Sequence, residues 1–121
     1  MSKKILIVDD EPNIVMSLEY AFKKQNYEVF IARDGQEALN ILESEIPNVV
    51  LLDIMMPKVD GYQTITQIKN NPQLTDVKVV FLTAKSKAAD VEKGLSLGAD
   101  KYLTKPFSIR KVVNEINQLI E

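Results

Sequence analysis

The strongest constraint on the fold of this chain is a regular alternation of short apolar runs with longer amphipathic stretches. The apolar runs have the length of β-strands, and most of them are rich in β-branched or aromatic residues. Five runs are expected to be strands: Ile5–Val8, Val29–Ala32, Val49–Leu52, Val77–Leu82 and Tyr102–Leu103. The last run is short, and its assignment depends partly on its position after the other four.

The stretches between and after these runs carry apolar residues at spacings of three and four, the period of an amphipathic helix. Five such stripes occur: Ile14, Leu18, Ala21 and Phe22; Ala38 and Leu42; Tyr62, Ile65 and Ile68; Ala88, Val91 and Leu95; and Ile109, Val112, Val113, Ile116 and Ile120. Pro12 suits a first helical turn, and Asp34 and Asp60, each followed by glycine, are typical of turns or N-caps. Gly98 suits the left-handed residue after a helix.

Five strands alternating with five helices predict βαβ crossovers, and therefore a parallel sheet with helices on both faces. The central runs are almost wholly apolar, as burial on both faces requires. A chain of 121 residues fits one domain, residues 1–121, and is too short for an eight-unit barrel. We expect an α/β fold, a flavodoxin-like doubly wound parallel sheet with strand order 2-1-3-4-5.

Composition excludes several classes of function. The chain has no cysteine and no histidine, which rules out disulfides, thiolate or imidazole metal ligands, and catalytic triads that need either residue. Its net charge of −2, with both signs interspersed, gives no basic surface for direct nucleic-acid binding. Only Ile5–Val8 is apolar near the N-terminus, which is too short for a signal peptide or a membrane span. We expect a soluble, cytoplasmic protein without membrane contact.

The polar residues that follow the strand runs predict where the chemistry lies. Ligands of open parallel sheets bind beyond the carboxyl ends of the strands, where the strand order reverses. Asp9 and Asp10 follow the first run, Asp53 the third, Thr83 the fourth, and Lys105 lies just beyond the fifth. In the expected order, the first and third strands flank the reversal point. The three aspartates should therefore lie side by side.

Three crowded carboxylates are unfavourable, because like charges raise one another's pKa, and a cation relieves this repulsion. With oxygen ligands alone, a hard ion fits: Mg²⁺, or else Mn²⁺ or Ca²⁺. A carboxylate beside such a metal, with the charge of Lys105 and the hydroxyl of Thr83 nearby, suits phosphoryl transfer. The product would be an aspartyl phosphate.

The motifs at these strand ends resemble those of the receiver domains of response regulators. They are Ile5–Glu11, Leu51–Pro57 followed by Asp60-Gly61, Leu82–Ala84, and Gly98–Phe107. Each motif is weak by itself, but their order along the whole chain is highly specific. The resemblance implies a switch of a two-component phosphorelay, phosphorylated by a sensor histidine kinase or a histidine phosphotransfer protein. Such a domain modifies only itself, so we do not expect an enzyme with a separate substrate.

The resemblance also implies roles for individual residues around the metal. Asp53 would be the phosphoacceptor. Asp10 and Asp53 would bind Mg²⁺, or Mn²⁺ in its place, with Asp9 acting through water and Met55 through its backbone carbonyl. Backbone N–H groups near Met55 and Ala84 would bond the phosphoryl group.

A second group of residues would connect the phosphoryl group to the surface. Thr83 and Lys105 would each bond a phosphoryl oxygen, and Lys105-Pro106 resembles a cis peptide that aims the lysine inward. Thr83 would move toward the phosphoryl group, and Tyr102 would rotate into the space. The face of the fourth helix, fifth strand and fifth helix would then bind an effector, or a second copy on phosphorylation. Gly94, in the middle of the fourth helix, costs about 1 kcal/mol relative to alanine and favours a mobile helix.

Some alternatives remain at this stage. Asp10 alone could cap the first helix, and Tyr102 could be a half-buried core tyrosine instead of a switch. An Mg²⁺-dependent phosphatase would place a second acid two residues after its nucleophile, where this chain has Met55. A flavodoxin would offer hydroxyls and amides to phosphate where this chain has Asp9-Asp10-Glu11. A receiver that is never phosphorylated would lack active-site residues, whereas all are present here.

Overall fold

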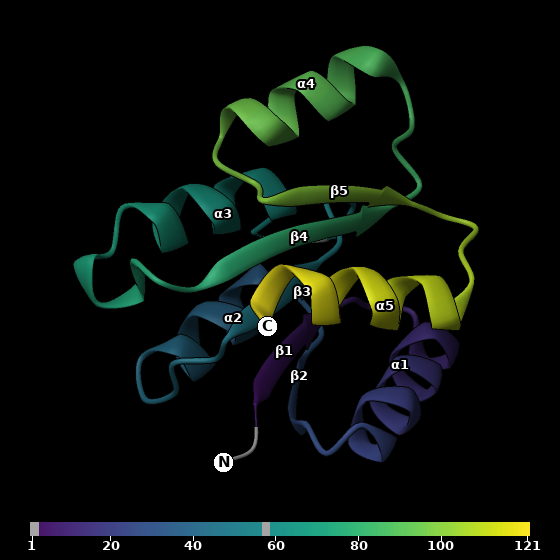
Figure 1. Ribbon diagram of the computed structural model, residues 1–121. Helices are drawn as coiled ribbons and strands as arrows, with labels where there is room; N and C mark the ends of the chain where they lie inside the picture. The colour runs from purple at the N-terminus through teal and green to yellow at the C-terminus, as the bar shows by residue number, and fades with distance from the viewer. Residues whose placement is uncertain (1–2, 57–58) are drawn as a thin grey trace.

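The computed structural model describes residues 3–56 and 59–121, in which five strands alternate with five helices as predicted (Figure 1). Pro57, from one of the sequence motifs, lies outside these residues. The elements are β1 (Lys4–Val8), α1 (Pro12–Lys24), β2 (Glu28–Ala32), α2 (Gly35–Leu42), β3 (Val49–Leu52), α3 (Gly61–Lys69), the 3-10 turn η1 (Pro72–Leu74), β4 (Lys78–Thr83), α4 (Ala88–Ser96), β5 (Lys101–Thr104) and α5 (Ile109–Ile120). Among the described helices, none has both the length and the apolar character needed to cross a membrane.

The sheet is parallel throughout and has the order β2-β1-β3-β4-β5, which confirms the predicted topology. Its register fixes the positions of the acids. Val8, the last residue of β1, pairs with Leu52, the last residue of β3. Directly beyond this pair, the backbone N–H of Asp53 donates to the carbonyl of Val8 at 3.0 Å. Asp9 and Asp53 therefore leave neighbouring strands at the same edge of the sheet.

Alternation along the strands divides the apolar core into two layers, because successive side chains point to opposite faces. Ile5 and Ile7 of β1 pack toward α1 and α5, and Leu6 and Val8 pack toward α2 and α3. In Figure 1, α5 crosses in front of the strands, whereas α2 and α3 lie behind them. Both layers consist of buried apolar side chains, so the sheet is a closely packed platform for the residues at its ends.

The helix ends follow the predicted signals. The Asp34 carboxylate accepts a hydrogen bond from the Glu37 backbone N–H at 2.9 Å and caps α2. Asp60 and Gln63 form a reciprocal capping box at the start of α3. Gly98, with φ +105°, adopts the left-handed conformation after α4. These caps end or begin the helices where the sequence predicted.

Helix α4 contacts the sheet in an unusual way. Within residues 59–121, Gly94 is the one residue of α4 that is buried. A Cβ atom at this position would lie 2.8 Å from Cε2 of the Tyr102 ring and 3.1 Å from Cδ2 of Phe81. The sequence interpretation of Gly94 as a weak point in the helix was therefore incomplete. The absence of a side chain is what allows α4 to approach β4 and β5.

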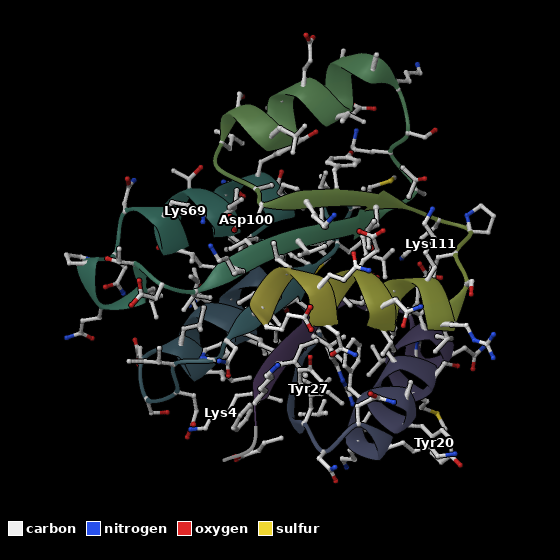
Figure 2. All side chains as sticks on the ribbon, viewed as in Figure 1. Lys4, Tyr20, Tyr27, Lys69, Asp100 and Lys111 are labelled. Atoms are coloured by element: carbon white, nitrogen blue, oxygen red, sulfur yellow. The ribbon has the colours of Figure 1, made fainter. Side chains whose placement is uncertain are left out.

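An ion pair fixes the turn between α4 and β5. Lys69, at the end of α3, and Asp100 point toward each other in Figure 2, and their Nζ and Oδ2 atoms are 3.2 Å apart. The same Asp100 oxygen accepts a hydrogen bond from the backbone N–H of Val79 at 2.8 Å. Strand β5 follows directly and spans Lys101–Thr104, one residue longer at each end than predicted.

Candidate functional site

Three aspartates form a compact cluster at the carboxyl edge of the sheet. Asp9, Asp10 and Asp53 each offer a carboxylate oxygen, and these oxygens all lie within 4.8 Å of one another. Asp9 and Asp53 are buried, whereas Asp10 is exposed. The expectation that acids from two neighbouring strands meet at this edge is confirmed.

Asp10 does not cap the first helix, so that alternative is wrong. The N-cap of α1 is Glu11, and Pro12 occupies the first helical turn as predicted. The Glu11 backbone N–H donates instead to Oδ1 of Asp9 at 3.0 Å. The carboxylate of Asp10 is left facing the cluster and solvent.

The electrostatics of the cluster disfavour negative charge. Burial raises the pKa of Asp9, and the nearby charge of Asp53 raises it further. Hydrogen bonds from the Glu11 backbone and from Lys105 oppose this shift without cancelling it. A bound cation would stabilise the ionised form of Asp9.

Lys105 carries the positive charge of the site. Its Nζ lies 2.7 Å from Oε1 of Glu11, 3.0 Å from Oδ2 of Asp9 and 3.2 Å from Oδ2 of Asp53. Burial opposes the charged form, but the bonds to Glu11 and Asp9 and the charge of Asp53 outweigh it and raise the pKa of Lys105 well above its usual range. The lysine is therefore an ammonium at any physiological pH. The peptide bond from Lys105 to Pro106 is cis, as the motif indicated.

Thr83 ends β4, and Tyr102 lies within the neighbouring strand β5. Thr83 is fully buried at the end of β4, and its backbone carbonyl accepts a hydrogen bond from the Lys105 N–H at 2.8 Å. Tyr102 is half-buried, and its hydroxyl donates to the carbonyl of Lys85 at 2.7 Å. Burial, with smaller effects from Tyr62 and Asp90, raises the pKa of Tyr102 to about 12. Tyr102 thus contacts the loop that begins just after Thr83.

Met55 and Ala84 complete the set of predicted positions. The Met55 backbone N–H donates to Oδ1 of Asp53 at 3.2 Å, while its side chain is exposed. Ala84 is exposed directly after Thr83. The predicted metal and phosphoryl positions therefore lie at or just beyond the carboxyl ends of β1, β3, β4 and β5, whereas Tyr102 lies within β5 and pairs in register with Phe81.

The donor set determines which metal the cluster can hold. It consists of carboxylate oxygens, which suit a hard divalent cation such as Mg²⁺ or Mn²⁺. The pKa of Asp9 is raised mainly by burial and further by the charge of Asp53, so a bound cation would stabilise its ionised form. These observations fit a divalent metal site.

Sequence reasoning treated Glu11 only as part of a motif and missed its contact with Lys105. The one available signal was its position directly after Asp9 and Asp10. That position does not predict the direction of a side chain in the first turn of a helix.

Fold and site together define a doubly wound α/β domain with an acidic, lysine-paired centre at the carboxyl edge of its sheet. A family model described as the response regulator receiver domain matches residues 5–117. The chain therefore belongs to the response regulator receiver domain family, whose function is phosphorylation-dependent signalling in two-component systems. The resemblance found in the sequence is confirmed.

Named relatives agree with this assignment. The chain is 42% identical over 120 residues to the alkaline phosphatase synthesis transcriptional regulatory protein PhoP of Bacillus subtilis, covering 99% of this chain and 49% of PhoP. The structure of a putative response regulator from Chloroflexus aurantiacus is 28% identical, with a TM-score of 0.92 and coverage of 99% and 98%. The BeF3-activated receiver domain of DrrB, a Thermotoga maritima protein, is 33% identical, with a TM-score of 0.90 and coverage of 98% and 97%. The chain spans about half the length of the curated relatives it matches.

Proposed function

We propose that Asp53 accepts a phosphoryl group from a sensor histidine kinase or a histidine phosphotransfer protein, in a reaction that requires Mg²⁺ or Mn²⁺. A carboxylate oxygen of Asp53 attacks phosphorus, and the bond from phosphorus to the donor nitrogen breaks as the new P–O bond forms. The observation that carries this proposal is the convergence of Asp9, Asp10, Asp53 and Lys105 at one edge of the sheet.

The metal would be held by the carboxylates of Asp10 and Asp53, by Asp9 through water, and by the backbone carbonyl of Met55. When bound, it neutralises part of the negative charge that develops on the phosphoryl oxygens. The clustering of the three carboxylates within 4.8 Å supports this assignment, because one lysine offsets only part of their charge.

The remaining residues would bind the phosphoryl group itself. Lys105 is an ammonium beside Asp53 and can pair with one oxygen, and the hydroxyl of Thr83 can donate to another. Backbone N–H groups near Met55 and Ala84 would donate as well. The existing bond from the Met55 N–H to Asp53 supports this role, because it already points at the reactive carboxylate.

Thr83 and Tyr102 would transmit the conformational change caused by phosphorylation to the surface. Movement of Thr83 toward the phosphoryl group would shift the loop whose Lys85 carbonyl binds the Tyr102 hydroxyl. Tyr102 would then rotate and change the face formed by α4, β5 and α5. An effector protein or domain, or a second copy of this chain, would bind there.

On this proposal, residues 1–121 form one receiver domain that acts in the cytoplasm and turns over no separate substrate. It would contact neither membrane nor nucleic acid directly. The names of the curated relatives, which are transcriptional regulators, support an effector that acts in transcription.

The direct test is incubation with acetyl phosphate and Mg²⁺, followed by intact-mass measurement. Wild type and the control Asp76→Asn, which changes an exposed acid, should gain the mass of one phosphoryl group. Asp53→Asn should gain none, and a metal chelator should prevent the gain in wild type. Equal modification of all three proteins would show that the acceptor lies elsewhere.

Metal binding can be tested without phosphorylation. Mg²⁺ should raise the melting temperature of wild type, with a gain of about 1.4 kcal/mol at a concentration ten times Kd. Asp53→Ala should slightly stabilise the metal-free protein, because one of the crowded charges is removed. An unchanged melting temperature with Mg²⁺ would contradict the metal site, and a clearly destabilised Asp53→Ala would indicate a structural role for Asp53.

A further inference from the structure

The ammonium group of Lys105 has no hydrogen-bond donor left to offer. A lysine carries three N–H donors, and here three carboxylates surround the nitrogen. Glu11 is the nearest at 2.7 Å, followed by Asp9 at 3.0 Å and Asp53 at 3.2 Å. A phosphoryl oxygen on Asp53 therefore has to compete with the present partners for this lysine.

We propose that Glu11 is a positioning residue that holds Lys105 in the unphosphorylated protein and competes with the phosphoryl group for it. This inference rests on the proposed function and assigns a regulatory contact to the same site. In this role Glu11 contacts neither Asp53 nor the phosphoryl donor. It acts through Lys105.

Exposure identifies Glu11 as the partner that is released. The side chain of Glu11 is 56% exposed, whereas those of Asp9 and Asp53 are 4% and 5% exposed. A carboxylate at the surface returns to water when its partner leaves. Asp53 loses its free carboxylate on phosphorylation, so its contact with Lys105 passes to its own phosphoryl group. The buried carboxylate of Asp9 would lose a charge partner without gaining water, which is less favourable than release of Glu11.

The Glu11 side chain has no other evident task in the described part of the chain. Glu11 occupies the N-cap of α1, but its side chain makes no capping hydrogen bond there. Its backbone N–H is already bonded to Asp9. The contact with Lys105 is therefore a property of the site and not of the helix end.

The consequence is that the contact between Glu11 and Lys105 stabilises the resting state but not the phosphorylated state. A phosphoryl group on Asp53 would compete with Glu11 for Lys105 and weaken the pair between them. The pair thus weakens the phosphorylated state relative to the resting one, and its removal strengthens binding of a phosphoryl group or a phosphoryl analogue.

The test is a titration of the full chain with beryllium trifluoride in saturating Mg²⁺, read by tyrosine fluorescence and by NMR. Glu11→Gln keeps the shape of the side chain and removes its charge, and it should lower the half-saturating concentration roughly two- to fivefold, the range of an exposed ion pair. Glu11→Asp keeps the charge but shortens the side chain, and should also tighten binding. The matched control is Glu45→Gln, which removes a partly exposed carboxylate paired with Lys4 at 3.2 Å and should leave binding unchanged.

A second readout needs neither metal nor analogue. The ammonium protons of Lys105 should exchange with water faster in Glu11→Gln than in wild type or Glu45→Gln, because one of their acceptors is weakened. A change confined to the stability of the helix would not alter this exchange.

The outcomes separate this inference from the proposed function. Equal titrations and equal ammonium exchange for Glu11→Gln and Glu45→Gln would overturn the role of Glu11. A second result would also overturn it: tighter binding by Glu11→Gln together with wild-type binding by Glu11→Asp. The negative charge at position 11 would then weaken binding without any direct contact with Lys105. Failure of wild type to bind beryllium trifluoride, or equal binding by Asp53→Asn, would instead contradict the phosphoacceptor role of Asp53.

Discussion

Helices α4 and α5 precede and follow the same edge strand, β5, and differ in how they are attached to the rest of the molecule. Helix α5 buries Val112, Val113 and Ile116 in the core shared with α1. In the described range 59–121, α4 buries Gly94 and no larger residue, and Leu95 on it is 46% exposed. Apolar burial is the main source of stability, so α5 is anchored and α4 is held weakly. The proposed signalling face, formed by α4, β5 and α5, therefore combines a weakly held helix with an anchored one.

The largest expected effect is the loss of a core side chain from α5. Ile116→Ala should lower the free energy of unfolding by about 3 kcal/mol, because it removes a fully buried side chain and leaves a cavity. Leu95→Ala on α4 should cost less than about 0.5 kcal/mol. Denaturant unfolding measures both. Similar losses would break the contrast between the helices, as would hydrogen exchange that is equally slow in α4 and α5.

The next largest effect concerns Gly94→Ala, whose effect on stability should have the opposite sign to that of the same substitution in an ordinary helix. Replacing glycine by alanine inside a helix normally stabilises it by about 1 kcal/mol. Here Gly94→Ala should destabilise the protein by about 1–2 kcal/mol, because the new Cβ would clash with the Tyr102 ring.

The double variant with Tyr102→Ala removes the two shortest contacts and gives the Phe81 ring, 3.1 Å from the new Cβ, room to shift. In this background, Gly94→Ala should destabilise the protein clearly less than in wild type when measured by thermal unfolding. A stabilising effect of Gly94→Ala in wild type would show that the close contact does not constrain α4.

Two tyrosines, one bonded to α5 and one near α4, extend the comparison of these helices to hydrogen bonding. The hydroxyl of Tyr27 donates to Oδ1 of Asn117 on α5 at 2.5 Å, so Tyr27→Phe should cost about 1 kcal/mol. The hydroxyl of Tyr62, on the α4 side, is buried without a partner among the described residues. Tyr62→Phe should therefore stabilise the protein by up to about 1 kcal/mol. Chemical denaturation of both variants would show whether the signs differ.

The last expected effect, similar in size to those of the two tyrosines, is a dependence on high pH. The pKa of Tyr102 is raised to about 12 in the folded protein, mainly by burial. A raised pKa means that the stabilisation is complete below the unfolded value near 10 and is lost as the pH rises toward 12. Between pH 9 and 11, wild type should lose roughly 1 kcal/mol more stability than Tyr102→Phe. Parallel pH profiles would contradict this.

Much of the fold was predictable because its signals are local. Apolar runs, helical spacing and the capping residues Asp34 and Asp60 each act within a few neighbouring residues, and all three agree on the same topology. The cluster of Asp9, Asp10 and Asp53 followed in turn, since a parallel sheet brings the carboxyl ends of its strands to one edge.

What the sequence did not predict depends on side-chain direction and close packing. Glu11 reaches Lys105 across 94 residues of sequence, through a rotamer that no local pattern specifies. The role of Gly94 depends on the position of the Tyr102 ring, which belongs to another element. Propensity alone assigned this glycine a cost, whereas packing makes it a requirement.

The contact at Gly94 has a consequence for how α4 can move. An aliphatic side chain inserted in a core leaves an empty space when its helix withdraws, and the lost packing resists withdrawal. A glycine leaves no such void behind. Movement of α4 over the ring of Tyr102 would therefore cost less packing than withdrawal of a helix that inserts an aliphatic side chain. Gly94→Ala would strengthen α4 as an isolated helix, but in the protein it would hinder movement of α4 over the ring of Tyr102.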